Sequence, residues 1–180
     1  MIELRSLLKS LNISAIFVTH NKDEVFSFAD KIALMHQGRI IQAGSPREVF
    51  DQPSCWQVAD FLQIGSWLPV NVEGDQVYTA LGNLSINNLT FNDNDQVTLL
   101  VKPQFLAIIS GDANCVVTHI SFTEHGYHYL LSSIEQSSKL AFENLSFYSQ
   151  SILSLEQTLR LQLLPHSYQL FAQQIDNINT

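Results

Sequence analysis

Charged side chains are scarce in this 180-residue sequence, at 14% of the residues, and most of them are acidic. Nine Lys and Arg stand against seventeen Asp and Glu, which gives a formal net charge of −8. Nucleic-acid binding needs clustered Lys and Arg to neutralise phosphates, and we find no such cluster. This composition argues against nucleic acid as a partner. So low a total charge also suggests that part of the surface meets a partner, or that a piece of the protein is missing from this sequence.

The sequence also has only two cysteines and no long apolar run. Cys55 and Cys115 lie far apart and lack metal-ligand spacing, so we expect reduced thiols and no disulfide framework. No apolar run approaches the ~20 residues that a membrane-spanning helix needs. If this protein functions at a membrane, we therefore expect it to dock to a partner that is embedded there. Hydrophobic residues still make up 46% of the chain, which is enough for a packed core.

One apolar run ends in polar residues that could bind a ligand. Ala15–Val18 is typical of a strand buried on both faces, and Thr19 and His20 follow at its expected carboxyl end. In open α/β sheets, ligands bind at that edge. A histidine there can hydrogen-bond a phosphate, and its charge can change near neutral pH.

The residues that follow predict a helix and then a hairpin. Asn21 or Asp23 is suited to cap a helix that runs to about Phe28. Strands are expected over 31–36 and 39–43, joined by a Gln-Gly turn. The helix residues that we expect to be buried are Val25, Phe26 and Ala29.

Three further helices are predicted in the first third of the chain. Residues 1–11 place apolar side chains at near-helical spacing. Residues 45–48 read Ser-Pro-Arg-Glu, which combines an N-cap serine, a proline at the first helical position and a glutamate at the third. That helix should end before Gln52, and another should cover 56–62.

From residue 67 onward the segments become short, alternating and separated by turn residues, which favours a small β-barrel or sandwich. Residues 143–157 are expected to form a loop or a short helix. The predicted strands are 67–72, 76–80, 84–86, 96–102, 106–110, 114–122, 127–134, 138–142, 158–164 and 168–171.

The first part of the chain resembles the end of the nucleotide-binding domain of ABC transporter ATPases, of the importer type that includes ferric-iron, spermidine and sulfate members. The matching residues are Val18 to Asn21, Glu24, Ala29 to Ile32, Gly38 to Ile40 and Gly44 to Pro46. The resemblance implies that His20 is the catalytic histidine that contacts the γ-phosphate of ATP. It also implies that Asn21, where the family has Asp, lies beside it at the dimer seam.

The second part resembles the TOBE domain, an OB-like regulatory barrel of importer ATPases. The resemblance rests on Val97–Leu106, with Lys102 and Gln104 in place of the family's Arg and Glu, and on the closing run 161–171. Residues 68–84 look most like the ferric-iron uptake members. The expected fold class is therefore α+β.

Two domains follow from these resemblances. Residues 1–65 would be the carboxyl-terminal portion of an α/β nucleotide-binding domain. Residues 66–180 would be a TOBE-like regulatory β-barrel.

The sequence contains no Gly-x-x-x-x-Gly-Lys-Ser/Thr phosphate loop, on which ATP binding in the family depends. We therefore expect this chain to be the carboxyl-terminal part of a longer ATPase and to be inactive alone, with ATP and Mg²⁺ as cofactors of the full-length protein only. The resemblance implies permease subunits, a second ATPase copy and, indirectly, a solute-binding protein as partners. It also implies a peripheral location on the cytoplasmic face of the plasma membrane.

A second interpretation comes from a different class of function. The barrel alone could be a regulatory, ligand-binding or dimerisation module that has no ATPase activity. Nucleotide binding distinguishes the two interpretations.

One histidine-rich segment could suggest a metal site. His119, His125 and His128 occur close together with Glu124, but a turn at Gly126 separates them. In a strand, residues 125 and 128 would also point to opposite faces. The spacing favours a solvated hairpin, so no metal ligands are assigned.

Overall fold

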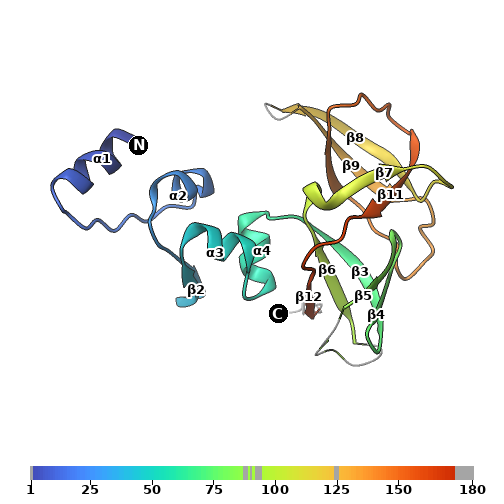
Figure 1. Ribbon diagram of the computed structural model, residues 1–180, viewed down its shortest axis with the longest axis horizontal. Helices are drawn as coiled ribbons and strands as arrows, with labels where there is room; N and C mark the ends of the chain where they lie inside the picture. Colours follow the sequence, from blue (N-terminus) through green and yellow to red (C-terminus); the bar gives the residue numbers. More distant parts are fainter. Residues whose placement is uncertain (1, 87–88, 90, 92–94, 124–125, 173–180) are drawn as a thin grey trace. The chain divides into compact units, whose positions relative to one another are not determined.

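The computed structural model describes residues 2–86, 89, 91, 95–123 and 126–172 (Figure 1). The chain divides into two compact units, Met1–Ile64 and Gly65–Thr180. Within the described residues, sheet predominates over a few short helices, which confirms the α+β class. No helix in those ranges is long and apolar enough to cross a bilayer.

Unit 1 contains four short helices and one hairpin. Its elements are α1 (Ile2–Ser10), α2 (Lys22–Phe28), β1 (Ile32–His36), β2 (Arg39–Gly44), α3 (Pro46–Asp51) and α4 (Trp56–Leu62). β1 and β2 pair antiparallel around the predicted Gln-Gly turn.

Local capping explains where two of these helices begin. The Asn21 side chain accepts a hydrogen bond from the Asp23 backbone N–H at 3.0 Å, so Asn21 is the N-cap of α2. Ser45 caps α3 in a capping box, in which its own backbone N–H donates to the Glu48 carboxylate at 2.8 Å. Each cap satisfies backbone groups that the first helical turn leaves unpaired. The caps predicted from the sequence are confirmed.

The predicted strand over 15–18 is wrong. Residues 13–19 form no strand, and the Ile16 and Val18 side chains are 97% and 91% exposed. A strand buried on both faces lies inside a sheet whose two faces are both covered, whereas the only sheet of unit 1, within the described residues, is the β1–β2 hairpin.

The expected burial on α2 is also not realised. Val25, Phe26 and Ala29 are only half-buried, because no sheet in the described part of unit 1 covers this face of α2. Phe26 makes an edge-to-face contact with Phe50, with ring centroids 5.7 Å apart.

Unit 2 is built from two five-stranded antiparallel sheets, which can be followed in Figure 1. The first has the order β12-β6-β3-β4-β5 and the second has the order β10-β9-β8-β11-β7. The strands are β3 (Ser66–Glu73), β4 (Gln76–Thr79), β5 (Gly82–Ser85), β6 (Val97–Val101), β7 (Leu106–Ile109), β8 (Cys115–Thr123), β9 (Gly126–Ser133), β10 (Leu145–Ser149), β11 (Thr158–Leu163) and β12 (Gln169–Ala172), with a 3₁₀ turn η1 (Pro103–Phe105).

Both sheets contribute to one hydrophobic core. Alternate residues of β3 point inward, and Leu68 and Val72 are fully buried. Tyr129 and Leu131 of β9 and Leu161 of β11 enter the same cluster from the other sheet. This period-two alternation is the signal that located most of the strands in the sequence.

The sheets do not close into the expected OB-like barrel. Near the start of β3, the Ser146 backbone N–H of β10 donates to the Ser66 side-chain oxygen at 2.9 Å. A barrel needs backbone-to-backbone pairing at every seam, whereas this bond between the two sheets is made to a side chain. The strand pairing therefore leaves two separate sheets.

The strand predicted over 138–142 is also wrong. That segment forms turns, in which the Leu140 backbone N–H donates to the Ser138 hydroxyl at 3.2 Å. Asn144 then adopts a left-handed conformation with φ 56°, and β10 begins at the next residue. The loop or short helix expected over 143–157 is therefore wrong at 145–149, where Leu145 and Phe147 of β10 point into the core.

Candidate functional site

A polar turn joins the extended segment 13–19 to α2. The Thr19 hydroxyl donates to the Glu24 carboxylate at 2.8 Å, and the Asn21 backbone N–H donates to Thr19 Oγ1 at 3.0 Å. With the Asn21 cap, these bonds fix the backbone on both sides of His20. The turn is a local structure that depends on residues within six positions of one another.

The His20 imidazole is exposed at this turn and has no hydrogen-bond partner among the residues that the structure describes. Its neighbours are already engaged, since the Asn21 side chain caps α2 and the Lys22 ammonium donates to the Gln63 side-chain oxygen. The arrangement leaves one ring, held on an ordered turn, able to bind an external acceptor or donor.

The turn fits a contact to one phosphate group of a nucleotide, but not a whole nucleotide site. The Glu24 carboxylate is bonded to Thr19, and across the described ranges no group of three His, Cys, Asp or Glu could hold a metal ion. A Mg²⁺-nucleotide needs several phosphate contacts and metal ligands. No catalytic step can be derived from the residues of this turn alone.

Asp30, which lies just after α2, forms ion pairs with two residues of α1. The Arg5 guanidinium donates to the Asp30 carboxylate, and the Lys9 ammonium lies 3.6 Å from the same oxygen. The hydrogen bond from Arg5, followed by the charge of Lys9, holds the pKa of Asp30 below its ordinary value. The Asp30 and Lys9 side chains are well exposed and that of Arg5 is partly exposed, so the pairs are open to screening by salt.

The histidine-rich segment lies on the β8–β9 hairpin, and Glu124 and His125 fall outside the described residues. His119 is exposed, whereas the half-buried His128 ring bonds to two serine hydroxyls, with Nε2 2.8 Å from Ser146 Oγ and Nδ1 3.3 Å from Ser121 Oγ. Burial, and then the nearby His119, lower the pKa of His128. With both ring nitrogens in use, His128 acts as a link between strands.

Cys115 does not present a reactive thiolate in this fold. Both Cys55 and Cys115 are free, and Cys115 is fully buried in the core of unit 2. Burial raises the pKa of the Cys115 thiol to about 12, so it stays protonated at neutral pH.

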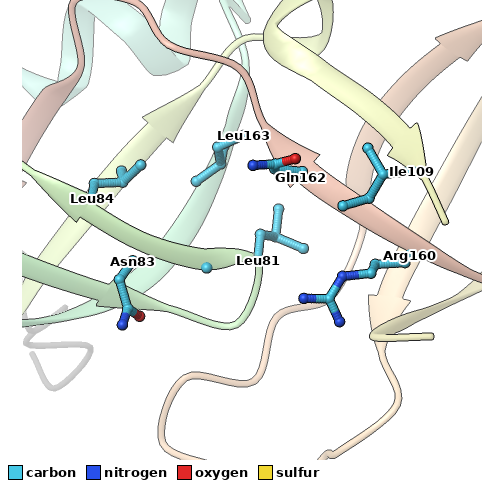
Figure 2. Close-up of a pocket in the computed structure, with 8 residues that line it drawn as sticks. Leu81, Asn83, Leu84, Ile109, Arg160, Gln162 and Leu163 are labelled. Atoms are coloured by element: carbon cyan, nitrogen blue, oxygen red, sulfur yellow. The ribbon is translucent and has the colours of Figure 1, made fainter. Parts of the chain in front are cut away.

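A pocket of about 140 Å³ in unit 2 was not foreseen from the sequence. Figure 2 shows its lining side chains, with Leu81 among them and the Arg160 guanidinium extending toward Leu81. The alternation of β11 could have placed Arg160 and Gln162 on one face. Nothing local in the sequence, however, brings the β4–β5 turn beside them.

Comparisons with known proteins relate this chain to import ATP-binding proteins. No family model matches the chain. It is 34% identical over 113 residues to the sulfate/thiosulfate import ATP-binding protein CysA of Brucella melitensis, a match that covers 63% of this chain and 31% of the relative. It is 34% identical over 113 residues to the Fe(3+) ions import ATP-binding protein FbpC of Haemophilus influenzae, covering 62% and 32%.

A third relative, similar at a comparable level of identity, carries a different solute in its name. The spermidine/putrescine import ATP-binding protein PotA of Ruegeria pomeroyi is 35% identical over 117 residues, covering 62% of this chain and 32% of the relative. The match therefore spans about a third of the length of these relatives. Over that region the chain is homologous to ATP-binding subunits of ABC importers, which confirms the resemblance stated from the sequence.

Proposed function

We propose that this chain is the carboxyl-terminal part of the ATP-binding subunit of an ABC importer. Unit 1 would be the end of the nucleotide-binding domain and unit 2 a TOBE-like, OB-related regulatory domain. The observation that carries the proposal is the ordered Thr-His-Asn turn, which presents an unengaged His20, in a chain homologous to import ATP-binding proteins.

The apolar segment before this turn supports the proposal. Ile16 and Val18 are almost fully exposed, and they lie in an extended stretch without strand partners in the described structure. So much exposed apolar surface is unfavourable in water and suits a strand that is completed by other polypeptide. A nucleotide-binding sheet supplied by another part of the protein would provide that partner.

In this proposal His20 is the residue that contacts the terminal phosphate of ATP. Asn21 lies next to it at the seam between two ATPase copies. The phosphate loop and the ligands of Mg²⁺ belong to a part of the protein outside this sequence, so these 180 residues alone do not hydrolyse ATP. ATP and Mg²⁺ would supply the phosphoryl group and the charge neutralisation in the complete protein.

The complete protein would work as a homodimer on the cytoplasmic face of the plasma membrane. It would dock to permease subunits and receive solute indirectly from a solute-binding protein. Among possible solutes we propose ferric iron, because residues 68–84 look most like the ferric-iron uptake members. The FbpC relative carries Fe(3+) in its name, whereas the CysA and PotA relatives carry sulfate/thiosulfate and spermidine/putrescine.

A gain-of-function experiment tests the main proposal. The amino-terminal part of the Haemophilus influenzae FbpC, up to the position that aligns with Val18, would be joined to this chain from Thr19. We expect the fusion to hydrolyse Mg-ATP and the 180-residue chain alone to be inactive. A folded fusion that binds Mg-ATP but never turns it over would contradict the proposal.

A second candidate function is a regulatory or dimerisation module without ATPase activity. The observation that favours it is that unit 2 has a continuous hydrophobic core of its own, drawn from both sheets. A ligand-induced change confined to residues 65–180, in a fusion that never binds nucleotide, would favour this candidate over the first.

A further inference from the structure

The pocket of unit 2 combines an apolar floor with a polar rim. Leu81 and Leu163, each only 4% exposed, form the floor, and Leu84 and Ile109 add further apolar wall. The rim carries the side chains of Arg160, Gln162 and Asn83, all exposed to solvent. Such a division suits a small ligand that is apolar at one end and polar at the other.

Hydrogen bonds hold both walls of the pocket in place. The Asn114 side chain accepts from the Leu161 N–H of β11 and donates to the Leu161 carbonyl, both at 2.9 Å. It also lies 3.4 Å from the carbonyl of Ala80, in the turn that leads to β5. The Thr79 hydroxyl donates to the Gly82 carbonyl at 2.7 Å and closes that turn. The pocket is therefore preformed, which lowers the entropic cost of binding.

Arg160, the one cation among the described residues that line the pocket, is held in place by its neighbours. The Arg160 guanidinium donates through Nη1 to the Asp112 carbonyl at 3.1 Å, which leaves its other N–H groups available. Gly111 makes room for the side chain, because a Cβ at that position would lie 2.9 Å from Arg160 Cδ. The head group extends toward Leu81 at the floor and not away from it (Figure 2).

These features select the chemistry of the ligand. A guanidinium presents paired N–H donors that match a carboxylate. Inorganic sulfate or phosphate would leave the leucine floor uncovered. The volume of about 140 Å³ is close to that of an apolar cavity of about 150 Å³ known to hold one benzene-sized molecule, so the whole ligand should have about six carbon atoms.

We propose that this pocket binds a short aliphatic carboxylate, with the carboxylate on Arg160 and the hydrocarbon body on Leu81 and Leu163. The site lies wholly within unit 2. It does not depend on nucleotide, so its test is independent of the importer function proposed above.

The test is a titration of the ¹⁵N-labelled 180-residue chain with 4-methylpentanoate, followed through the backbone amide signals of the pocket residues. We expect saturable shifts at Leu81, Asn83 and Arg160. Affinity should rise from acetate through butyrate to hexanoate, by at least about fourfold over the series, since one fully buried methylene contributes about 0.8 kcal/mol. It should fall again for decanoate, which exceeds the pocket.

Two variants and three comparison ligands decide the outcome. Arg160→Gln should weaken binding of 4-methylpentanoate about tenfold or more, because a charge-assisted pair is lost. The matched control Arg47→Gln, at an exposed arginine of α3, should leave the affinity unchanged. The neutral 4-methylpentanamide, sulfate and phosphate should each bind at least about tenfold more weakly than 4-methylpentanoate.

Three results would overturn the proposal. They are the absence of saturable shifts at the pocket residues, equal affinity in the wild-type chain and Arg160→Gln, and affinity for sulfate or phosphate that matches that for 4-methylpentanoate.

Discussion

Thr19 and Glu24 are joined across five positions by a 2.8 Å hydrogen bond, in which the Thr19 hydroxyl donates to the Glu24 carboxylate. The same Thr19 oxygen accepts the backbone N–H of Asn21 at 3.0 Å. One hydroxyl thus connects the extended segment, the turn that carries His20 and the first turn of α2. The position of the histidine depends on this link.

Thr19→Val should therefore loosen the turn. The Asn21 amide loses its acceptor, a loss of about 1 kcal/mol, so its hydrogen exchange should speed up about fivefold. Thr19→Ser keeps the oxygen and should retain the protection. Exchange measured by NMR on both variants checks this, and equal rates in Thr19→Val and Thr19→Ser would show that the hydroxyl does not order the turn.

Gly65 begins unit 2 in a place where no side chain fits. A Cβ there would lie 2.3 Å from the Val101 carbonyl oxygen, so Gly65→Ala must push β3 and β6 apart. We expect a loss of about 2–3 kcal/mol in the free energy of unfolding, measured with urea. Gly74→Ala is a useful control, because its Cβ would meet nothing within 4 Å and only the left-handed backbone is penalised, by about 1 kcal/mol. If Gly65→Ala lowers the free energy of unfolding no more than Gly74→Ala does, the close approach of Gly65 to the Val101 carbonyl is contradicted.

The stability of unit 2 should fall in mild acid. Burial lowers the pKa of His128 and of His166 in the folded protein, whereas both have their ordinary value of about 6.5 in the unfolded chain. Below about pH 6.5 the unfolded state binds more protons, so the free energy of unfolding decreases as pH falls from there toward the folded-state pKa values.

Urea unfolding at pH 7.5 and pH 5.5 measures this change. His128→Gln should reduce the difference in the free energy of unfolding between pH 7.5 and pH 5.5. The matched control His36→Gln, at an exposed position of β1, should leave it intact. A free energy of unfolding that is the same at both pH values in the wild-type chain would rule out a contribution from these histidines.

The exposed apolar segment should cause self-association. Ile16 and Val18 are 97% and 91% exposed, and the backbone around them has no strand partner in the described residues. Bare extended backbone and apolar surface favour pairing between chains. We expect size-exclusion chromatography to show species larger than a monomer at high concentration.

The double variant Ile16→Ser, Val18→Ser should shift the chain toward monomer. Ile152→Ser, at a 74% exposed position of unit 2, should not. A clean monomer of the unaltered chain at high concentration would contradict this account of the segment.

Features that depend on neighbours in the sequence could be predicted. The Asn21 and Ser45 caps and the Gln37–Gly38 turn follow from local hydrogen bonds and backbone preferences, and the structure confirms all three. Most strands of unit 2 were also predictable, because the alternation of buried and exposed residues is written along each strand.

Features that depend on distant partners could not be predicted in the same way. Residues 15–18 have the composition of a buried strand, but composition does not provide the neighbouring strands that would bury it. The bond between the Ser146 backbone and the Ser66 side chain, which links the two sheets of unit 2, joins residues 80 positions apart. The pocket likewise needs Leu81 from the β4–β5 turn and Arg160 from β11, and no local pattern pairs them.

The candidate site was predicted only in part. The sequence located Thr19, His20 and Asn21, and the structure places them together in one ordered turn. The role of His20 at a phosphate and that of Asn21 at a dimer seam stay predictions, because they concern groups that this chain does not contain.

The most direct test of the central claim is Mg-ATP hydrolysis by the fusion described above, compared between His20→Ala and His36→Ala. Both positions are exposed histidines of unit 1, so the pair separates the role of the turn from a general loss of imidazole. We expect His20→Ala to lower turnover at least about 100-fold and His36→Ala to leave it nearly unchanged. Hydrolysis that survives in His20→Ala at the wild-type rate, or that appears in the 180-residue chain alone, would contradict the account.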